Sequence, residues 1–112
     1  MEQSGPRIRV EESTDFAYVR LNDSEYLEDW QIKGLQDEIL PVIDEVKERR
    51  IVIDFENVRL MSSAFLGLLI RILKRTNEQK SKLELINIRP EIRKVFKITN
   101  LDKVFDITKT TK

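Results

Sequence analysis

The sequence has 112 residues, of which 40% are hydrophobic and 36% charged, and its formal net charge is zero. This balance excludes a disordered or membrane-spanning chain and argues against a dedicated nucleic-acid binder. The absence of Cys and His excludes disulfides, thiolate zinc sites and catalytic triads built on imidazole. With no signal peptide or membrane span visible, we expect one cytoplasmic domain over residues 1–112, with polar termini and an ordered core over roughly 7–108.

The N-terminal part predicts a hairpin followed by a helix. Apolar side chains alternate over residues 8–10 and 16–21, and the polar segment 12–15 between them forms a turn. An apolar stripe at helical spacing follows, made of Ile32, Leu35, Ile39, Ile43 and Val46. We expect Pro41 to kink this helix and Arg49–Arg50 to end it.

The rest of the chain alternates strands and helices. Residues 51–55 (IVIDF) predict a strand buried on both faces of a parallel sheet. A strongly apolar helix opens at 61–63, a strand follows over 83–88, and Pro90 starts a third helix with Ile92, Val95 and Phe96 inward. A short strand is expected over 104–107. Strands joined by helices of this length imply βαβ crossovers, so the predicted fold is an α/β domain with a mostly parallel sheet.

The end of the 51–55 strand partly matches two classes of protein, a phosphatase and a phosphorelay receiver. Asp54 and Glu56 loosely resemble the Asp-x-Asp loop of haloacid-dehalogenase-like phosphatases, and paired carboxylates suit a hard cation. The second carboxylate is Glu, however, and the expected downstream motifs are missing, so a metal-dependent phosphatase is the weaker alternative. A phosphorelay receiver fails because the 83–88 strand ends without a hydroxyl residue. We therefore predict no catalytic residues, no metal site and no cofactor.

Residues 58–69 (VRLMSSAFLGLL) carry the most information. A loop feeds Ser62 and Ser63 into the first turn of an apolar helix, where a serine oxygen commonly caps an unpaired backbone N–H. The same position tolerates a phosphate, because the helix dipole and the free N–H groups favour an anion. Sequence alone leaves both roles open.

This segment resembles the STAS domains of anti-sigma factor antagonists. Their signature is a strand ending near Asp, a short loop, and Asp-Ser-Ser-Gly-Leu-Gly opening a helix. Residues 51–58 (IVIDFENV) resemble that strand and loop, and residues 62–67 (SSAFLG) align with the motif without a gap. Residues 92–107 resemble the closing helix and strand of the family, with Asn100 where the family has a Gly at the end of the helix. The resemblance covers nearly the whole chain.

The resemblance implies a STAS fold: a mixed, mostly parallel sheet with one antiparallel edge strand and helices packed on it. It places the family's phospho-accepting serine on Ser63, with Ser62 as the alternative acceptor. The family's preceding Asp is Ser62 here, its second Ser is Ala64, its first Gly is Phe65, and its last Gly is kept as Gly67. We expect a side chain at Gly67 to crowd the sheet.

The resemblance also implies a function as a partner switch. The unphosphorylated form would bind an anti-sigma factor that is also a Ser/Thr kinase and so free a sigma factor. Phosphorylation would release it, and a separate phosphatase would reset it, with no direct binding of nucleic acid and no membrane insertion. The alternative is a STAS scaffold or subunit of a stress-sensing or transport assembly, which needs no modifiable serine. The expected partner surface comprises Met61, Ser62, Ser63, Ala64, Phe65 and Gly67, with Phe65 either an aromatic anchor or a core residue.

Charge is distributed unevenly along the chain. Residues 1–56 hold 15 acidic and 7 basic residues, whereas residues 57–112 hold 5 acidic and 13 basic residues. Either the two halves fold against one another and neutralise their charges, or they form oppositely charged faces, one of which docks a charged partner.

Overall fold

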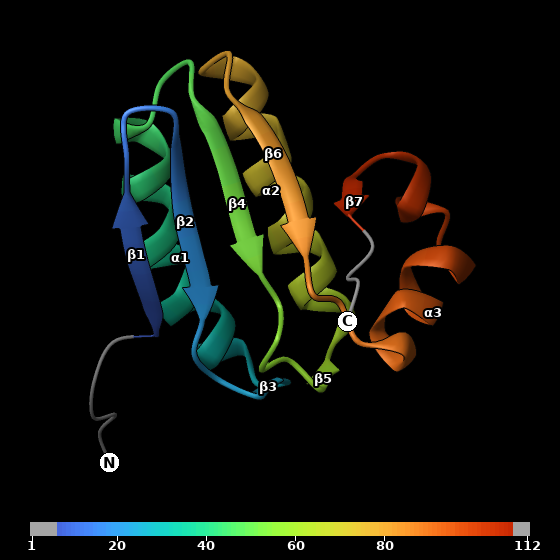
Figure 1. The fold of residues 1–112 in the computed structure, drawn as a ribbon. Coiled ribbons are helices and arrows are strands. Elements are labelled where there is room, and N and C mark those ends of the chain that lie inside the picture. Colours follow the sequence, from blue (N-terminus) through green and yellow to red (C-terminus); the bar gives the residue numbers. More distant parts are fainter. Residues whose placement is uncertain (1–6, 109–112) are drawn as a thin grey trace.

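The computed structural model describes residues 7–108, which form an α/β fold (Figure 1). The elements, in chain order, are β1 (Ile8–Glu12), β2 (Phe16–Leu21), β3 (Glu25–Tyr26), α1 (Asp29–Glu45), β4 (Arg50–Asp54), β5 (Leu60–Met61), α2 (Ser63–Glu78), β6 (Lys82–Ile86), α3 (Pro90–Ile98), the 3₁₀ helix η1 (Leu101–Lys103) and β7 (Asp106–Thr108). The main sheet has the order β1-β2-β4-β6-β7. Among the described strands of this sheet, only β1 and β2 pair antiparallel, so the expected mixed sheet with an antiparallel edge strand is confirmed.

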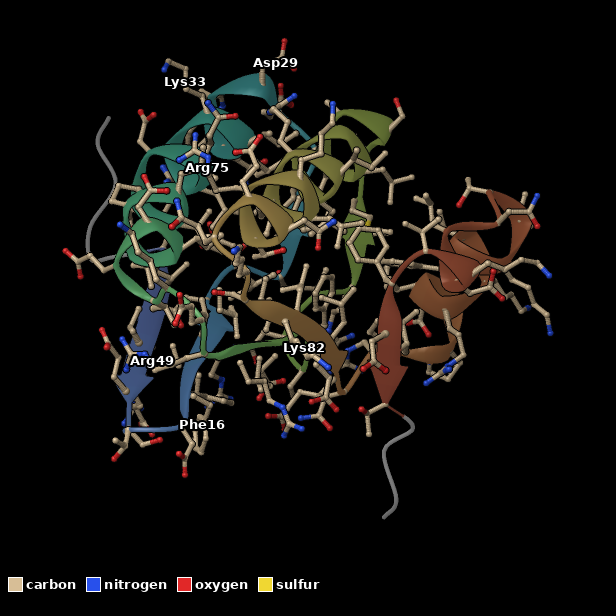
Figure 2. All side chains as sticks on the ribbon, turned by 90° about the horizontal axis from the view of Figure 1, so that it is seen from above. Phe16, Asp29, Lys33, Arg49, Arg75 and Lys82 are labelled. Atoms are coloured by element: carbon tan, nitrogen blue, oxygen red, sulfur yellow. The ribbon has the colours of Figure 1, made fainter. Side chains whose placement is uncertain are left out.

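Helices α1 and α2 lie side by side on one face of the main sheet, while α3 lies beyond its β7 edge (Figures 1 and 2). Alternate strand residues face these two helices and are buried, as at Val19, Ile53 and Leu85. The opposite face carries the row Tyr18, Val52 and Glu84, which are in register and only partly buried. The prediction that residues 51–55 are buried on both faces therefore holds only in part: Asp54 is buried on the second face, whereas Val52 is half-buried because no described helix covers it.

Several element boundaries differ from the sequence pattern, among them that of β6, which ends at Ile86 and not at Ile88. Helix α1 ends at Glu45, before Arg49–Arg50, and it continues through Pro41, which is exposed to solvent. Because water can hydrogen-bond the carbonyl that Pro41 leaves unpaired, the helix does not end there. The last strand, β7 (Asp106–Thr108), begins two residues later than expected, because Leu101–Lys103 form a 3₁₀ helix first. Asn100 has the expected left-handed backbone, with φ of 63°.

Ion pairs join the two oppositely charged halves of the sequence. Arg75 on α2 contacts Asp44 on α1 at 2.7 Å, and Arg50 on β4 contacts Glu84 on β6 at 3.9 Å. Mutual neutralisation of the halves therefore occurs at Arg75–Asp44, whereas Arg50–Glu84 joins a basic residue of the acidic half to an acidic residue of the basic half. No helix in the described range 7–108 has the length and apolar character needed to cross a bilayer.

A series of aromatic rings forms the part of the core that holds the start of α2. Tyr26 and Phe65 stack with ring centroids 4.8 Å apart and planes 16° from parallel. Phe65 also meets Phe55 edge-on at 6.1 Å, and the series continues through Phe96 to Phe105. Rings in such geometry contribute beyond the area they bury. The series joins β3, α2, the end of β4, α3 and the segment before β7.

We expect Phe65→Ala to lower the free energy of unfolding by about 3–5 kcal/mol, because the truncation leaves a cavity between two rings. Chemical denaturation followed by far-UV circular dichroism measures this loss. Phe16→Ala, at an exposed position in β2, is the matched control and should change stability by less than about 1 kcal/mol. A Phe65→Ala protein as stable as the control would contradict the assignment of Phe65 to the core.

Candidate functional site

The candidate site is the N-terminal end of α2, which Ser62 caps. The Ser62 backbone is extended, with φ of −96° and ψ of 172°, and its Oγ accepts a hydrogen bond from the Phe65 N–H at 3.4 Å. The Ser62 N–H in turn donates to the Tyr26 carbonyl at 3.0 Å. Ser62 is thus engaged in the capping role that favours serine at this position.

Ser63 is the first residue of α2, and its side chain is exposed. The first turn of α2 contains no acidic residue, whereas α1 has Asp29 and α3 has Glu91 at the equivalent place. A helix N-terminus carries roughly half a positive elementary charge from its aligned peptide dipoles. The start of α2 therefore offers an exposed hydroxyl in an electrostatic environment that favours an anion.

The other predicted surface residues are divided between surface and core. Ala64 is exposed beside Ser63, and Met61 in β5 is partly buried against the core. Phe65 is wholly buried, so of its two possible roles the structure has the core role, and Phe65 is removed from the partner-contacting set. Its burial follows from the stacking on Tyr26, a residue that the sequence pattern did not select.

Gly67 borders a groove between the N-terminal halves of α1 and α2. The groove is lined by Ile32, Lys33 and Gln36 from α1 and by Ala64, Gly67 and Arg71 from α2, with Asp29 at its margin. A Cβ built at Gly67 would meet no atom closer than Arg71 Nη1 at 4.0 Å. The expectation that a side chain would crowd the sheet was wrong, because Gly67 faces this open groove.

Asp54, the candidate phosphatase carboxylate, is buried at the end of β4 and fully engaged. It accepts hydrogen bonds from the Glu56 N–H at 2.8 Å, from Asn87 Nδ2 at 3.0 Å and from the Tyr18 hydroxyl. Burial, together with the hydrogen bond and the charge of Asp54, raises the pKa of Tyr18 to about 12. Within residues 7–108, no group of three or more acidic side chains is arranged to hold a metal ion. Asp54 thus ties β2, β4 and the segment after β6 together.

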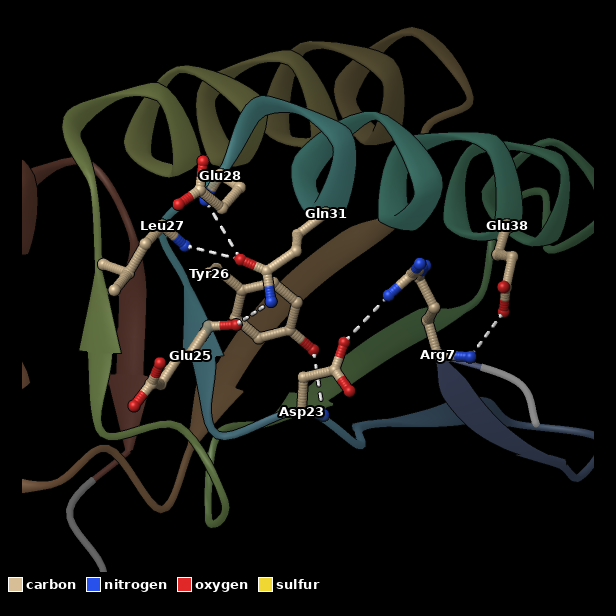
Figure 3. Close-up of polar contacts among 8 residues, drawn as sticks. All are labelled: Arg7, Asp23, Glu25, Tyr26, Leu27, Glu28, Gln31 and Glu38. Carbon is tan, nitrogen blue, oxygen red and sulfur yellow. Dashed lines mark hydrogen bonds and ion pairs between the residues drawn. The ribbon is translucent and has the colours of Figure 1, made fainter. Parts of the chain in front are cut away.

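A polar cluster that the sequence pattern did not reveal positions β3 and the start of α1 (Figure 3). Gln31 Oε1 accepts from the backbone N–H groups of Leu27 and Glu28 at 3.1 and 3.0 Å, and Gln31 Nε2 donates to the Glu25 carbonyl at 3.0 Å. The Tyr26 hydroxyl accepts from the Asp23 N–H at 3.2 Å. The spacing from Glu28 to Gln31 is that of a capping box, which is the signal that could have located this cluster.

Comparison with known proteins identifies relatives of this arrangement. Residues 7–112 match the model of the STAS domain family. An anti-sigma-B factor antagonist of Staphylococcus aureus is 24% identical over 104 residues, which cover 93% of this chain and 95% of the relative. A STAS-domain containing protein of Pseudomonas aeruginosa is 30% identical over 63 residues; this match covers 56% of the chain and 62% of that relative, less than two thirds of its length.

Solved structures share the fold. An anti-sigma-factor antagonist (STAS) domain protein from Planctomyces limnophilus superposes with a TM-score of 0.79 at 23% identity, covering 94% of this chain and 91% of the other. The Bacillus cell fate determinant SpoIIAA, solved in its phosphorylated form, gives a TM-score of 0.69 at 22% identity, with coverage of 94% and 92%. At sequence identities of 22–23%, these superpositions show a shared fold.

We expect Gly67→Ala to raise the free energy of unfolding by about 0.5–1 kcal/mol, since alanine favours a helix interior over glycine and the added methyl group meets open space. Gly34→Ala on α1 is the matched comparison, because a Cβ there would lie 2.4 Å from Arg7 Nε. That variant should be less stable than Gly67→Ala, as measured by urea denaturation of both. Equal gains from the two substitutions would contradict the open space assigned to Gly67.

Tyr18→Phe should lower the free energy of unfolding by about 1–3 kcal/mol near neutral pH, because it removes a hydrogen bond to a buried carboxylate. The Tyr18 pKa is raised from 10.0 to about 12 in the folded chain, so its stabilising contribution is fully present below about pH 10 and is lost as pH rises through 12. Urea denaturation of both proteins between pH 8 and 12 should show their difference shrinking. A difference that stays constant up to pH 12 would exclude the Tyr18–Asp54 interaction as its source.

Proposed function

Since the chain belongs to the STAS domain family, we propose that it acts as an anti-sigma factor antagonist. In this role it binds an anti-sigma factor and thereby frees the sigma factor that the anti-sigma factor holds. Two observations support the proposal: the S. aureus relative that aligns over 93% of the chain is named an anti-sigma-B factor antagonist, and the solved structures named as antagonists share the fold.

The binding is controlled by phosphorylation of Ser63, and the exposure of Ser63 on the first turn of α2 is the observation that carries this step. The anti-sigma factor is itself the Ser/Thr kinase, and it binds the ATP that donates the phosphate. SpoIIAA, which shares this fold, has been solved in a phosphorylated form, which supports a phosphoserine on such a framework. Ser62 is the less suitable acceptor, because its Oγ already accepts the capping hydrogen bond.

The phosphate acts on binding and leaves folding intact. It adds about −1.5 to −2 charges at neutral pH, and at a helix N-terminus without acidic neighbours this charge contributes about 0.3–1 kcal/mol of stabilisation. In the complex, the partner places no cation opposite Ser63, so a phosphate there is left unpaired. Losing water in this contact costs about 2–5 kcal/mol, or about 30- to several-thousand-fold in affinity.

The chain does no chemistry of its own in this scheme. Asp54 and Glu56 serve the framework through the contacts described above, and a separate phosphatase removes the phosphate from Ser63. We place this exchange between proteins in the cytoplasm, without direct contact to nucleic acid and without membrane insertion.

The test compares Ser63→Ala and Ser63→Asp with the wild type. Isothermal titration with the cognate anti-sigma factor kinase should show Ser63→Ala binding constitutively in the presence of ATP and Ser63→Asp binding at least tenfold more weakly. Both variants should melt within a few degrees of the wild type, since Ser63 is exposed.

Mass spectrometry of the chain after incubation with the kinase and ATP should place the phosphate on Ser63. Ser62→Ala is the matched control: it removes the cap and costs about 1 kcal/mol of stability, yet leaves the acceptor in place. Phosphate on Ser62 alone would refute the assignment, and phosphate on neither serine would favour the STAS scaffold.

A further inference from the structure

The burial of Phe65 leaves the proposed partner surface without its expected anchor, but other large apolar side chains lie exposed nearby. Seven such residues are exposed in the described chain: Phe16, Leu27, Trp30, Leu60, Ile70, Ile98 and Val104. Two of them lie at the small sheet, Leu27 directly after β3 and Leu60 in β5, and Trp30 lies close by in the first turn of α1. Exposed apolar groups that gather beside a candidate site mark a protein-binding surface more often than scattered ones do.

The register of the small sheet shows why these side chains face outward. β3 and β5 pair in parallel, with Glu25 opposite Leu60 and Tyr26 opposite Met61. Tyr26 is buried and Met61 packs against the core, so Glu25 and Leu60 occupy the outer face. The Leu27 side chain, one residue beyond Tyr26, points away from the Tyr26 ring (Figure 3). Leu27 and Leu60 are 44% and 50% exposed.

The backbone that carries both leucines is held in place before any partner binds. Gln31 Oε1 accepts a hydrogen bond from the Leu27 N–H. The N–H groups of Arg59 and Leu60 both donate to the Ser24 carbonyl, at 2.8 and 3.2 Å. Apolar side chains on a fixed backbone lose little conformational freedom on binding, which favours affinity. Trp30 lies three residues after Leu27, and the Arg7 guanidinium covers one side of its ring at 5.3 Å.

The charges around the leucines select the partner. Glu25, Glu28 and Asp29 are exposed at this end of the molecule, against the exposed Arg59 and Lys33. A second copy meeting the same surface face to face would bring like charges together, and nucleic acids and anionic lipids would be repelled. The surface is also continuous with Ser63, which follows Leu60 by three residues along β5 and the cap of α2.

We propose that Leu27 and Leu60 form the apolar anchor of the anti-sigma factor interface, flanked by Glu25 and Glu28. The complementary surface on the anti-sigma factor has an apolar centre, with Arg or Lys side chains opposite Glu25 and Glu28 and none opposite Ser63. This inference rests on the proposed function and adds the anchor residues and the chemistry of the partner to it.

The test is isothermal titration of the Leu27→Ser/Leu60→Ser double variant with the anti-sigma factor kinase that phosphorylates Ser63. We expect affinity to fall about tenfold or more, while the melting temperature stays within a few degrees because both positions are exposed. Phe16→Ser is the matched control: Phe16 is 40% exposed and starts β2 at the opposite end of the main sheet (Figures 1 and 2). It should bind within about twofold of the wild type.

Glu25→Lys tests the contribution of charge. This variant should bind the anti-sigma factor kinase more weakly than the wild type, and its affinity should depend less on salt concentration. A double variant that binds as tightly as the wild type would overturn the anchor while leaving the proposed function intact. Failure of the kinase to bind or phosphorylate the wild type would instead refute the proposed function, and the anchor with it. Sedimentation that shows the wild type as a dimer and the double variant as a monomer would assign the surface to a second copy and also overturn the proposal.

Discussion

The stacking of Phe65 on Tyr26 is the contact on which the arrangement of this end of the molecule depends. Phe65 is the third residue of α2 and Tyr26 the second residue of β3, so their contact joins the helix to the small sheet. The Ser62 N–H to Tyr26 carbonyl hydrogen bond fixes the same two segments through the backbone. Because both Tyr26 and Phe65 are fully buried, the start of α2 has one orientation relative to β3.

This orientation separates framework from surface within a single helical turn. Phe65 points into the core, and the neighbouring Ser63 and Ala64 therefore face solvent. Asp54 plays a similar framework part at the end of β4, where its hydrogen bonds satisfy a buried carboxylate. The residues that hold the fold and the residues proposed to meet a partner are thus different sets, which lets a modification alter binding without disturbing the core.

The fold was predictable because its signals are local. Period-two and helical patterns located β1, β2, α1, β4, α2, β6 and α3, and Ser62 was recognisable as a cap from its place before an apolar run. What escaped prediction depends on contacts between distant segments. The two-residue strands β3 and β5 have no pattern of their own, so the outward position of Leu60 could not be anticipated. The orientation of Phe65 was equally undecidable, because it depends on the ring of Tyr26.

The ring series also orders events during synthesis of the chain. Its members lie far apart in sequence, from Tyr26 to Phe105, so a nascent chain that has reached α2 still lacks Phe96 and Phe105. The β1–β2 hairpin closes over a short loop, whereas the ring series must wait for long-range contacts whose closure entropy is larger. A ribosome-bound or truncated chain that ends after α2 can therefore form the Tyr26–Phe65 stack, but it leaves Phe55 without its contact to Phe96 and exposes this apolar surface to chaperones.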